Sequence, residues 1–297
     1  MANIILRVAQ RDEYRELSRW LVKISRTPEQ HCLHTWSGQS AEELRRQLLS
    51  YLDDSELCYI LAVRDGQLVG AMGSEYDEEL ARGWLHGPHV IAKDGRKIAS
   101  QLFARLLVEL PACVRQLDAY LNVKNVQGRC FYTQRGFRES EKISYDFWLT
   151  PAGQIVSTDG LYGQIETWHA VSFLQLFQTI FPTAYYSGER ILHMIGRSHQ
   201  VFVIAEGSQV LGFAVVSVEA GSSAGEVQFL GVREDCRGQG YGRRLLQSAV
   251  GWLFEGAGVT RVCLNVGEEA LQARRLYESA GFNLKFVGVG LQWHSRR

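Results

Sequence analysis

The sequence contains an internal repeat, which limits the possible fold more than any other feature does. Residues 59–70 and 201–212 each read as a strand, a tight turn and a second strand, and their closing glycines, Gly70 and Gly212, lie 142 residues apart. Residues 132–137 and 277–282 share the pattern Tyr-x-x-x-Gly-Phe at an offset of 145. Between these segments, apolar residues recur at helical spacing over 98–110 and 245–254. The repeat predicts two copies of one domain.

The order of the expected elements gives each copy an α+β fold. In the second copy a hairpin precedes a strand at 227–232, and then a turn, a helix and a strand at 261–266 follow. Such a strand–helix–strand unit is a right-handed crossover between parallel strands. We therefore expect a layered α/β/α arrangement, with a mixed, mostly antiparallel sheet, a central parallel βαβ crossover and flanking helices. The predicted domains are 1–152 and 158–297, joined near Pro151-Ala152-Gly153.

The composition limits the classes of partner. The 297 residues include 32 Lys and Arg and 32 Asp and Glu, so the formal net charge is zero and there is no general attraction to nucleic acid or to an anionic membrane. No apolar run approaches the roughly 20 residues of a spanning helix, and the N-terminal segment does not read as a signal peptide. Six cysteines form no CxxC pair. These features predict a reduced, cytoplasmic protein that binds neither nucleic acid nor membrane.

A glycine-rich turn connects the strand at 227–232 to the next helix. In residues 237–242, Arg-Gly-Gln-Gly-Tyr-Gly, alternate glycines leave backbone N–H groups uncovered. The N-terminus of the following helix carries partial positive charge, so the turn suits a phosphate or pyrophosphate; a plain connecting turn is the alternative. It is not a Walker A loop, because Arg243-Arg244 stand where Lys-Ser/Thr is required. It is not a dinucleotide turn either, because that turn follows the first strand of a parallel sheet.

These residues resemble a known family. The turn matches the Q/R-x-x-G-x-G/A motif of GNAT-type acyl-CoA N-acyltransferases, and residues 225–232 look like the strand that leads into it. Residues 273–282 resemble the A-x-x-L-Y-x-x-x-G-F ending of the family. The detailed similarity covers 225–282, and the repeat extends a looser one over most of the chain. The resemblance implies two tandem GNAT-like domains, of which 1–152 is degenerate and 158–297 carries the acyl-CoA site.

The resemblance also implies how the co-substrate, acetyl-CoA or another acyl-CoA, is bound. The turn amides hold the pyrophosphate, and the preceding strand is splayed from its parallel neighbour so that its backbone pairs with the pantetheine amides. An N–H near Val232 polarises the thioester carbonyl. The implied cofactor-binding residues are Leu230, Gly231, Val232, Arg237, Gly238, Gln239, Gly240, Tyr241, Gly242 and Arg243.

Two side chains of the second copy are candidates for catalysis by direct attack of an amine on the thioester. Glu226 lies where several family members place the base, and Tyr277 lies where the family places the acid for the departing thiolate. Each has a simpler alternative. Glu226 also fits an ordinary carboxylate at the start of a strand. If Gly281 ends the helix in a left-handed conformation, Phe282 packs on Tyr277, which is then a packing residue.

Both copies depart from the family pattern. The second has Ala270 where the family often has an Asn that contacts the pantetheine arm, whereas the first keeps Asn125 there. The first also keeps Tyr132 at the position of Tyr277. Its turn differs more, because Lys97 aligns with Gly240 and Asp94 aligns with Arg237, which places a side chain and a negative charge in the phosphate space. We therefore expect one acyl-CoA site per chain, with the first copy as a scaffold.

The expected function is N-acetyl (acyl) transfer from CoA to a primary amine. A catalytically silent acyl-CoA-binding or sensing module, and a pair of domains that serves a protein partner without CoA, are the alternatives. The acceptor is expected to be a small-molecule or peptide amine, Tyr185 and Tyr186 are candidate acceptor contacts, and the protein is expected to be a monomer or homodimer. No metal is expected, because no further ligands complete His31-x-x-His34 or His86-x-x-His89.

Overall fold

The computed structural model describes residues 4–32, 40–151, 163–218 and 222–295. The chain divides into two compact units, of which the first contains Met1–Ser144 and Phe286–Arg297 and the second contains Tyr145–Lys285. Most of the predicted join, including Ala152, Gly153 and position 158, lies outside the described residues. The sequence division places 286–297 in the second domain, whereas these residues pack with the first unit.

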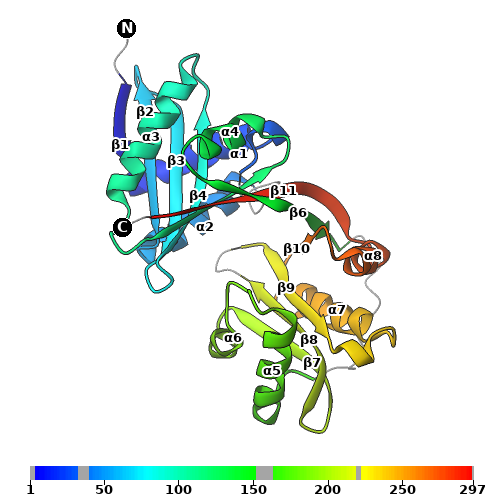
Figure 1. Ribbon diagram of the computed structural model, residues 1–297. Coiled ribbons are helices and arrows are strands. Elements are labelled where there is room, and N and C mark those ends of the chain that lie inside the picture. The colour runs from blue at the N-terminus through cyan, green and yellow to red at the C-terminus, as the bar shows by residue number, and fades with distance from the viewer. Residues whose placement is uncertain (1–3, 33–39, 152–162, 219–221, 296–297) are drawn as a thin grey trace. The chain divides into compact units, whose positions relative to one another are not determined.

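The first unit is a sheet with helices on both faces (Figure 1). The strands are, in spatial order, β1 (Ile4–Val8), β2 (Leu57–Arg64), β3 (Gln67–Asp77), β4 (Arg82–Val90), β5 (Gln116–Asn122), β11 (Asn283–His294) and the start of β6 (Arg138–Leu149). From β1 to β11, neighbouring strands are antiparallel except for β4 and β5, which are parallel. The helices are α1 (Tyr14–Ile24), α2 (Ala41–Asp53), α3 (Gly95–Glu109) and α4 (Val126–Thr133).

The second unit repeats this plan (Figure 1). Strands β7, β8 and β9 are antiparallel neighbours, and β9 and β10 are parallel. The strands are, in spatial order, the end of β6 (Arg138–Leu149), β10 (Arg261–Gly267), β9 (Ala224–Val232), β8 (Gln209–Val218) and β7 (His199–Glu206). The helices are α5 (Ala170–Ile180), α6 (Gly188–Met194), α7 (Tyr241–Gly251), which continues into a π-helical turn at Trp252–Gly256, and α8 (Leu271–Ser279).

Strand alternation builds one hydrophobic core on each face of each sheet. In β2, Tyr59 packs with α1 and α2 whereas Ile60 packs with α3, because successive side chains of a strand point to opposite faces. In β8, Phe213 packs with α5 whereas Ala214 packs with α7. The layered α+β class and the mixed sheets with a parallel crossover are therefore confirmed.

Local details of the repeat are also confirmed. The two predicted hairpins carry β-bulges at matching places, between Ala62 and Val63 and between Ile204 and Ala205. The helix before Pro111 ends at Glu109. The helix before Gly281 ends with the N–H of Phe282 bonded to the carbonyl of Tyr277 (3.0 Å) and with Gly281 at φ +90°, which is the predicted Schellman ending.

The last strand of the chain completes the sheet of the first unit. Residues 288–294 of β11 pair antiparallel with residues 116–122 of β5. The first residue of this unit's C-terminal segment, Phe286, stacks on Tyr120 and on His31, with ring centroids 5.5 Å apart in each case. The N-terminal unit thus depends on the chain's C-terminal residues for the strand between β5 and β6, which the repeat did not predict.

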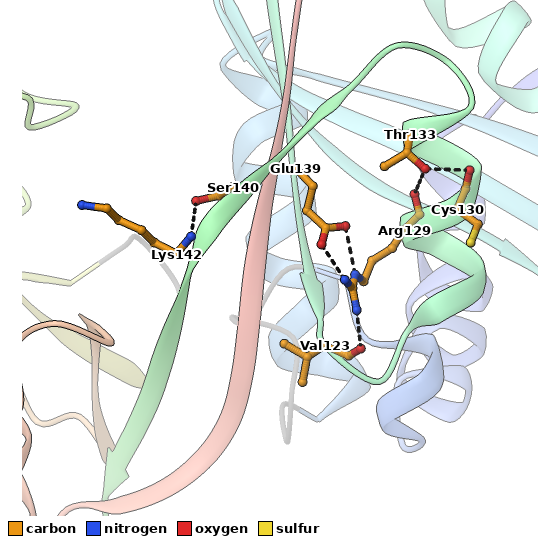
Figure 2. Close-up of polar contacts among 7 residues, drawn as sticks. All are labelled: Val123, Arg129, Cys130, Thr133, Glu139, Ser140 and Lys142. Atoms are coloured by element: carbon orange, nitrogen blue, oxygen red, sulfur yellow. Dashed lines mark hydrogen bonds and ion pairs between the residues drawn. The ribbon is translucent and has the colours of Figure 1, made fainter.

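An arginine ties three elements of the first unit together (Figure 2). The Arg129 guanidinium of α4 forms an ion pair with Glu139 of β6, and its Nη1 donates to the carbonyl of Val123, just after β5 (3.0 Å). The carboxylate of Glu139 is thereby turned to α4, so its charge is paired.

Candidate functional site

The predicted turn has the backbone that its glycines allow. Strand β9 ends at Val232 and α7 begins at Tyr241, so eight residues (233–240) separate them. Gly238 and Gly240 have φ of +79° and +82°, in the left-handed region that favours glycine. A Cβ built at either position would meet no heavy atom within 4 Å, adjoining residues aside. The space over the turn is therefore open.

The turn presents backbone donors to that space. Within the described residues, no hydrogen bond involves the N–H groups of Gly238, Gln239 or Gly240. Gly240 is the N-cap of α7, so the first N–H groups of this helix add further donors and partial positive charge. Exposed amides at a helix N-terminus form an anion-binding site of the kind that phosphates occupy.

Arginines surround the turn and are held in place. Arg237 Nε donates to the carbonyl of Val232 (3.2 Å), and Arg243 Nη2 donates to Ser279 Oγ of α8 (2.9 Å). The nearby carboxylate of Asp235 is paired with Arg233 (2.6 Å). The positive charge at the rim of the turn is thus available to an anionic ligand.

The strand before the turn separates from its parallel neighbour. Strands β9 and β10 pair only at Ala224–Glu226 with Arg261–Cys263. Residues 227–232 remain paired with β8 on the other side. Because alternate residues of an antiparallel strand direct their backbone groups away from a given neighbour, part of the backbone of 227–232 faces the opening between β9 and β10. Leu230, Gly231 and Val232 lie on this segment, directly before the turn.

Glu226 lies where the opening begins and faces α5 and α6. It is the last β9 residue paired with β10, and it is half-buried. Its neighbour Val227 packs with the α7 core, so the Glu226 side chain is on the opposite face. A β-bulge at Gln228 then returns Phe229 to the face of Glu226, where Phe229 packs with α5.

The short loop between α5 and α6 brings aromatic side chains to the same face. The Tyr185 ring lies 5.6 Å from the Phe229 ring, and Tyr185 is 44% exposed. Tyr186 lies 4.6 Å from Tyr185 and 6.1 Å from His199 of β7. The structure therefore places Glu226 and the two candidate acceptor residues on one face of the sheet.

Tyr277 is on α8, among apolar side chains. Its ring lies 6.5 Å from Phe147 and 6.0 Å from Phe282, so the predicted packing is present. In the described ranges its hydroxyl makes no hydrogen bond. Burial raises the pKa of Tyr277 to about 12, which keeps the phenol protonated at neutral pH. The packing of the Tyr277 ring does not prevent its hydroxyl from acting as a proton donor.

The corresponding turn of the first unit lacks an anion cradle. Strand β4 ends at Val90 and α3 begins at Gly95, so only four residues (91–94) lie between them. The helix starts about one turn earlier, and the carbonyl of Asp94 accepts from the N–H groups of Lys97 (3.0 Å) and Ile98 (3.2 Å). The Asp94 carboxylate stands at the helix N-terminus, paired with Arg64 (2.6 Å). The N–H groups of Lys97 and Ile98 are thus bonded within the helix, and a carboxylate stands beside its N-terminus, which disfavours a phosphate there.

The opening between β4 and β5 is filled by the chain itself. These strands pair only from Arg82–Leu85 with Gln116–Ala119, and Cys32 then forms an isolated antiparallel bridge to Leu121. The Cys32 thiol accepts from the N–H of Gly87 (2.9 Å). It also lies 3.2 Å from His89 Nε2.

The cysteine and histidine in this opening are not reactive groups. Both are completely buried. Burial raises the pKa of the Cys32 thiol to about 12 and lowers the pKa of His89 to about 3. The pair is therefore a neutral thiol beside a neutral imidazole, which suits a packing contact rather than nucleophilic catalysis.

Two further residues hold Cys32 and its neighbour His31 in the opening between β4 and β5, and we call Cys32 and His31 the plug. The Tyr132 hydroxyl donates to the carbonyl of Gly87 (2.6 Å), and Tyr132 is fully buried. Asn125 caps α4 through the N–H of Gly128 (2.9 Å) and donates to the carbonyl of His31 (3.1 Å). The Tyr and Asn positions of the repeat are thus occupied by internal bonds in the first unit.

The position of the plug between β4 and β5 was not predicted from the sequence. The loop between α1 and α2 has sixteen residues (25–40), whereas the loop between α5 and α6 has seven (181–187). This difference in loop length is the sequence feature that could have indicated an inserted segment, but loop length alone does not predict which strands the extra residues contact.

The described residues contain no group of three or more His, Cys, Asp and Glu side chains placed to hold a metal ion, and His34 lies outside them. No helix in the described ranges is long and apolar enough to span a membrane.

Comparison with known proteins agrees with this geometry. Residues 164–282 match the model of the acetyltransferase (GNAT) family. No curated protein matches the sequence. Among solved structures, a GCN5-related N-acetyltransferase from Sphaerobacter thermophilus is 18% identical, with a TM-score of 0.70 over 98% of this chain and 95% of that one. A tandem GNAT protein from the clavulanic acid biosynthesis pathway is 14% identical, with a TM-score of 0.64 over 98% of both chains.

A third similar structure is a putative acetyltransferase from Pyrococcus horikoshii, which is 17% identical, with a TM-score of 0.59 over 99% of this chain and 90% of that one. At these identities the structural likeness establishes the fold, and the family match lies within the second unit. Residues 164–282 are therefore a domain of the acetyltransferase (GNAT) family, in a chain whose whole length has the fold of tandem GNAT proteins.

Proposed function

We propose that the second unit transfers an acetyl group from acetyl-CoA to a primary amine and that each chain has one such site. The observation that carries this proposal is the glycine turn with unbonded amides directly after the separated part of β9. The turn amides and Arg237 and Arg243 would bind the pyrophosphate, and the free backbone of 230–232 would pair with the pantetheine arm.

In the proposed reaction, the amine nitrogen attacks the thioester carbonyl carbon, the C–N bond forms and the C–S bond breaks. Glu226 takes the proton of the amine through water, and Tyr277 gives its proton to the departing thiolate. The acceptor is a small-molecule or peptide amine that enters on the face of Tyr185 and Tyr186.

Turnover with acetyl-CoA and a panel of amines tests the proposal. The assay follows release of the CoA thiol and the mass of the N-acetylated product. We expect product with at least one amine. A catalytically silent acyl-CoA-binding module would show a CoA-induced rise in melting temperature without product. A protein that shows neither response to CoA belongs to the third alternative, a pair of domains that serves a protein partner.

The first unit is proposed to bind no CoA and to act as a scaffold. Its helix begins where the pyrophosphate turn should be, and Cys32 occupies the opening between β4 and β5. The proposed protein is cytoplasmic, is a monomer or homodimer, and binds no nucleic acid, membrane or metal. The zero formal net charge supports the proposal that it binds neither nucleic acid nor membranes.

A further inference from the structure

A cavity in the first unit lies at the opposite end of α3 from the turn at 91–94. Its volume is about 970 Å³, within the range of small-molecule pockets. It is formed by the C-terminal end of α3, the start of β5, the turn after α4 and the end of β11. Because α3 has 15 residues and rises about 1.5 Å per residue, the cavity lies roughly 22 Å from the N-terminus of α3. It is thus separate from the turn of the first unit that aligns with residues 237–242.

The walls of the cavity combine apolar and cationic groups. Leu107, Leu110 and Pro111 provide an apolar wall, and Trp293 provides an aromatic one. Arg115 and Arg138 lie at the exposed rim. None of the lining residues is Asp or Glu.

A third arginine in the lining is already bonded to neutral groups. Arg135 donates to the carbonyl of Phe131 (2.8 Å) and to Ser100 Oγ (2.6 Å), and its guanidinium lies 3.6 Å from the Phe131 ring centre. Burial lowers the pKa of Arg135. The carbonyl of Phe131 belongs to the last turn of α4, so Arg135 offsets the partial negative charge of that helix end.

The acids that adjoin the cavity lining in sequence each pair with an arginine outside the lining, and Asp118 also accepts from Gln292 of the lining (3.0 Å). Glu109, Asp118 and Glu139 adjoin lining residues, but they pair with Arg105, Arg82 and Arg129 respectively. Figure 2 shows the last of these pairs, with Glu139 directed to α4. Arg115 and Arg138 form no ion pair within the described residues. Guanidinium groups stay charged at all relevant pH values. Because Arg115 and Arg138 also lack an ion-pair partner there, their positive charge is available to a ligand.

We propose that this cavity binds a small anionic ligand with an apolar or aromatic body, held by its carboxylate or phosphate at Arg115 and Arg138. Guanidinium forks match carboxylate and phosphate oxygens in two-point contacts. The body would lie against Leu107, Leu110 and Trp293. Neither charge nor apolar surface alone explains the composition, because both kinds of side chain line one cavity.

The test titrates the full-length protein with four probes by calorimetry: 2-naphthoate, 2-naphthyl phosphate, 2-naphthamide and inorganic phosphate. We expect the two naphthyl anions to bind, and the neutral amide and inorganic phosphate to bind at least ten-fold more weakly. The stronger of the two anions identifies the preferred head group. Binding of 2-naphthamide as tightly as the naphthyl anions overturns the proposal, as does binding of inorganic phosphate without binding of either naphthyl anion.

Matched variants locate the probe. Arg138→Gln and Arg115→Gln should each weaken binding of the tighter naphthyl anion by roughly ten-fold or more, which is typical of a lost charge-assisted hydrogen bond. Arg19→Gln on α1 removes an exposed arginine of the same unit and should leave binding unchanged. Equal weakening by all three variants indicates general charge attraction and overturns the proposal. Titration of the same variants with acetyl-CoA, which should be unaffected, separates this result from the proposed transferase function.

Discussion

The two units have the same strand opening and use it in opposite ways. In the first unit β4 and β5 separate after Leu85, and Cys32 enters the opening, where it accepts from the N–H of Gly87 and forms an antiparallel bridge to Leu121. In the second unit β9 and β10 separate after Glu226, and the described residues contain no bridge between another segment and this opening. One opening is filled by its own chain, and the other is available to a ligand.

The difference comes from a loop rather than from the sheet. The loop between the first two helices of each unit has sixteen residues in the first unit and seven in the second. The long loop reaches Gly87, whereas the short one places Tyr185 against Phe229, which is the residue 142 positions after Gly87. A repeated sheet can therefore keep or lose a binding opening through the segment that crosses it.

The largest expected effect separates the two repeat tyrosines. Tyr277→Phe keeps the ring contacts with Phe147 and Phe282 and removes only the hydroxyl, so we expect turnover to fall by about 10²–10⁴-fold with little change in melting temperature. Because burial raises the pKa of Tyr277 to about 12, this acid should remain protonated, and it should cause no loss of rate below about pH 10. Initial rates with the best amine of the panel measure the loss of turnover and its dependence on pH.

Tyr132→Phe is the matched control in the first unit. It removes a buried hydrogen bond to Gly87, so we expect a loss of about 1–3 kcal/mol of stability and almost unchanged turnover. Differential scanning calorimetry and the same rate assay make the comparison. A normal rate in Tyr277→Phe, or an equal loss of rate in Tyr132→Phe, would contradict the division of roles.

The next effect concerns the pyrophosphate turn. Gly240→Asp places a negative charge in the open space over the turn, and acetyl-CoA affinity should fall by roughly 10²-fold, because like charges about 4 Å apart repel by a few kcal/mol near a protein surface. Gly240→Asn has the same shape and the same tolerance of positive φ, so it reports the steric part alone. Calorimetric titration of both variants should show the larger loss for Asp. Equal, small losses would mean that the turn does not hold a phosphate.

A smaller and pH-dependent effect is expected at the base. Glu226→Gln should lower the rate by about 10²-fold at pH 7, where an alkyl amine is protonated. As the pH rises towards the pKa of the amine, the free amine needs no base, so the defect should shrink. A rate profile over pH 7–10 measures this, and a constant defect would assign Glu226 to binding or packing instead.

The repeat predicted most of the local structure because local patterns encode it. Alternation predicted the hairpins, Pro111 the end of α3, and Gly281-Phe282 the Schellman ending. The turn at 237–242 was predicted because only glycine adopts its positive φ values without strain. The roles of Glu226 and Tyr277 rest on resemblance, and geometry alone does not assign a proton transfer.

Long-range features were not predictable. Strand β11 pairs with β5 across more than 160 residues, and nothing in its alternating pattern distinguishes one sheet edge from another. The plug at Cys32 joins residues 55 or more positions apart through contacts made by a thiol, a backbone amide and an imidazole. The early start of α3 was not predicted either, and it leaves four residues between β4 and α3, compared with eight between β9 and α7.

The central claim is that only the second opening binds acetyl-CoA. Calorimetric titration of the full-length protein with acetyl-CoA tests it most directly, alongside Lys97→Ala, which removes the one cation that aligns with Gly240 in the first unit. The account predicts a stoichiometry near one for the wild-type protein and for Lys97→Ala, with unchanged affinity. A stoichiometry near two that falls to one in Lys97→Ala would show that both units bind acetyl-CoA and would contradict the claim.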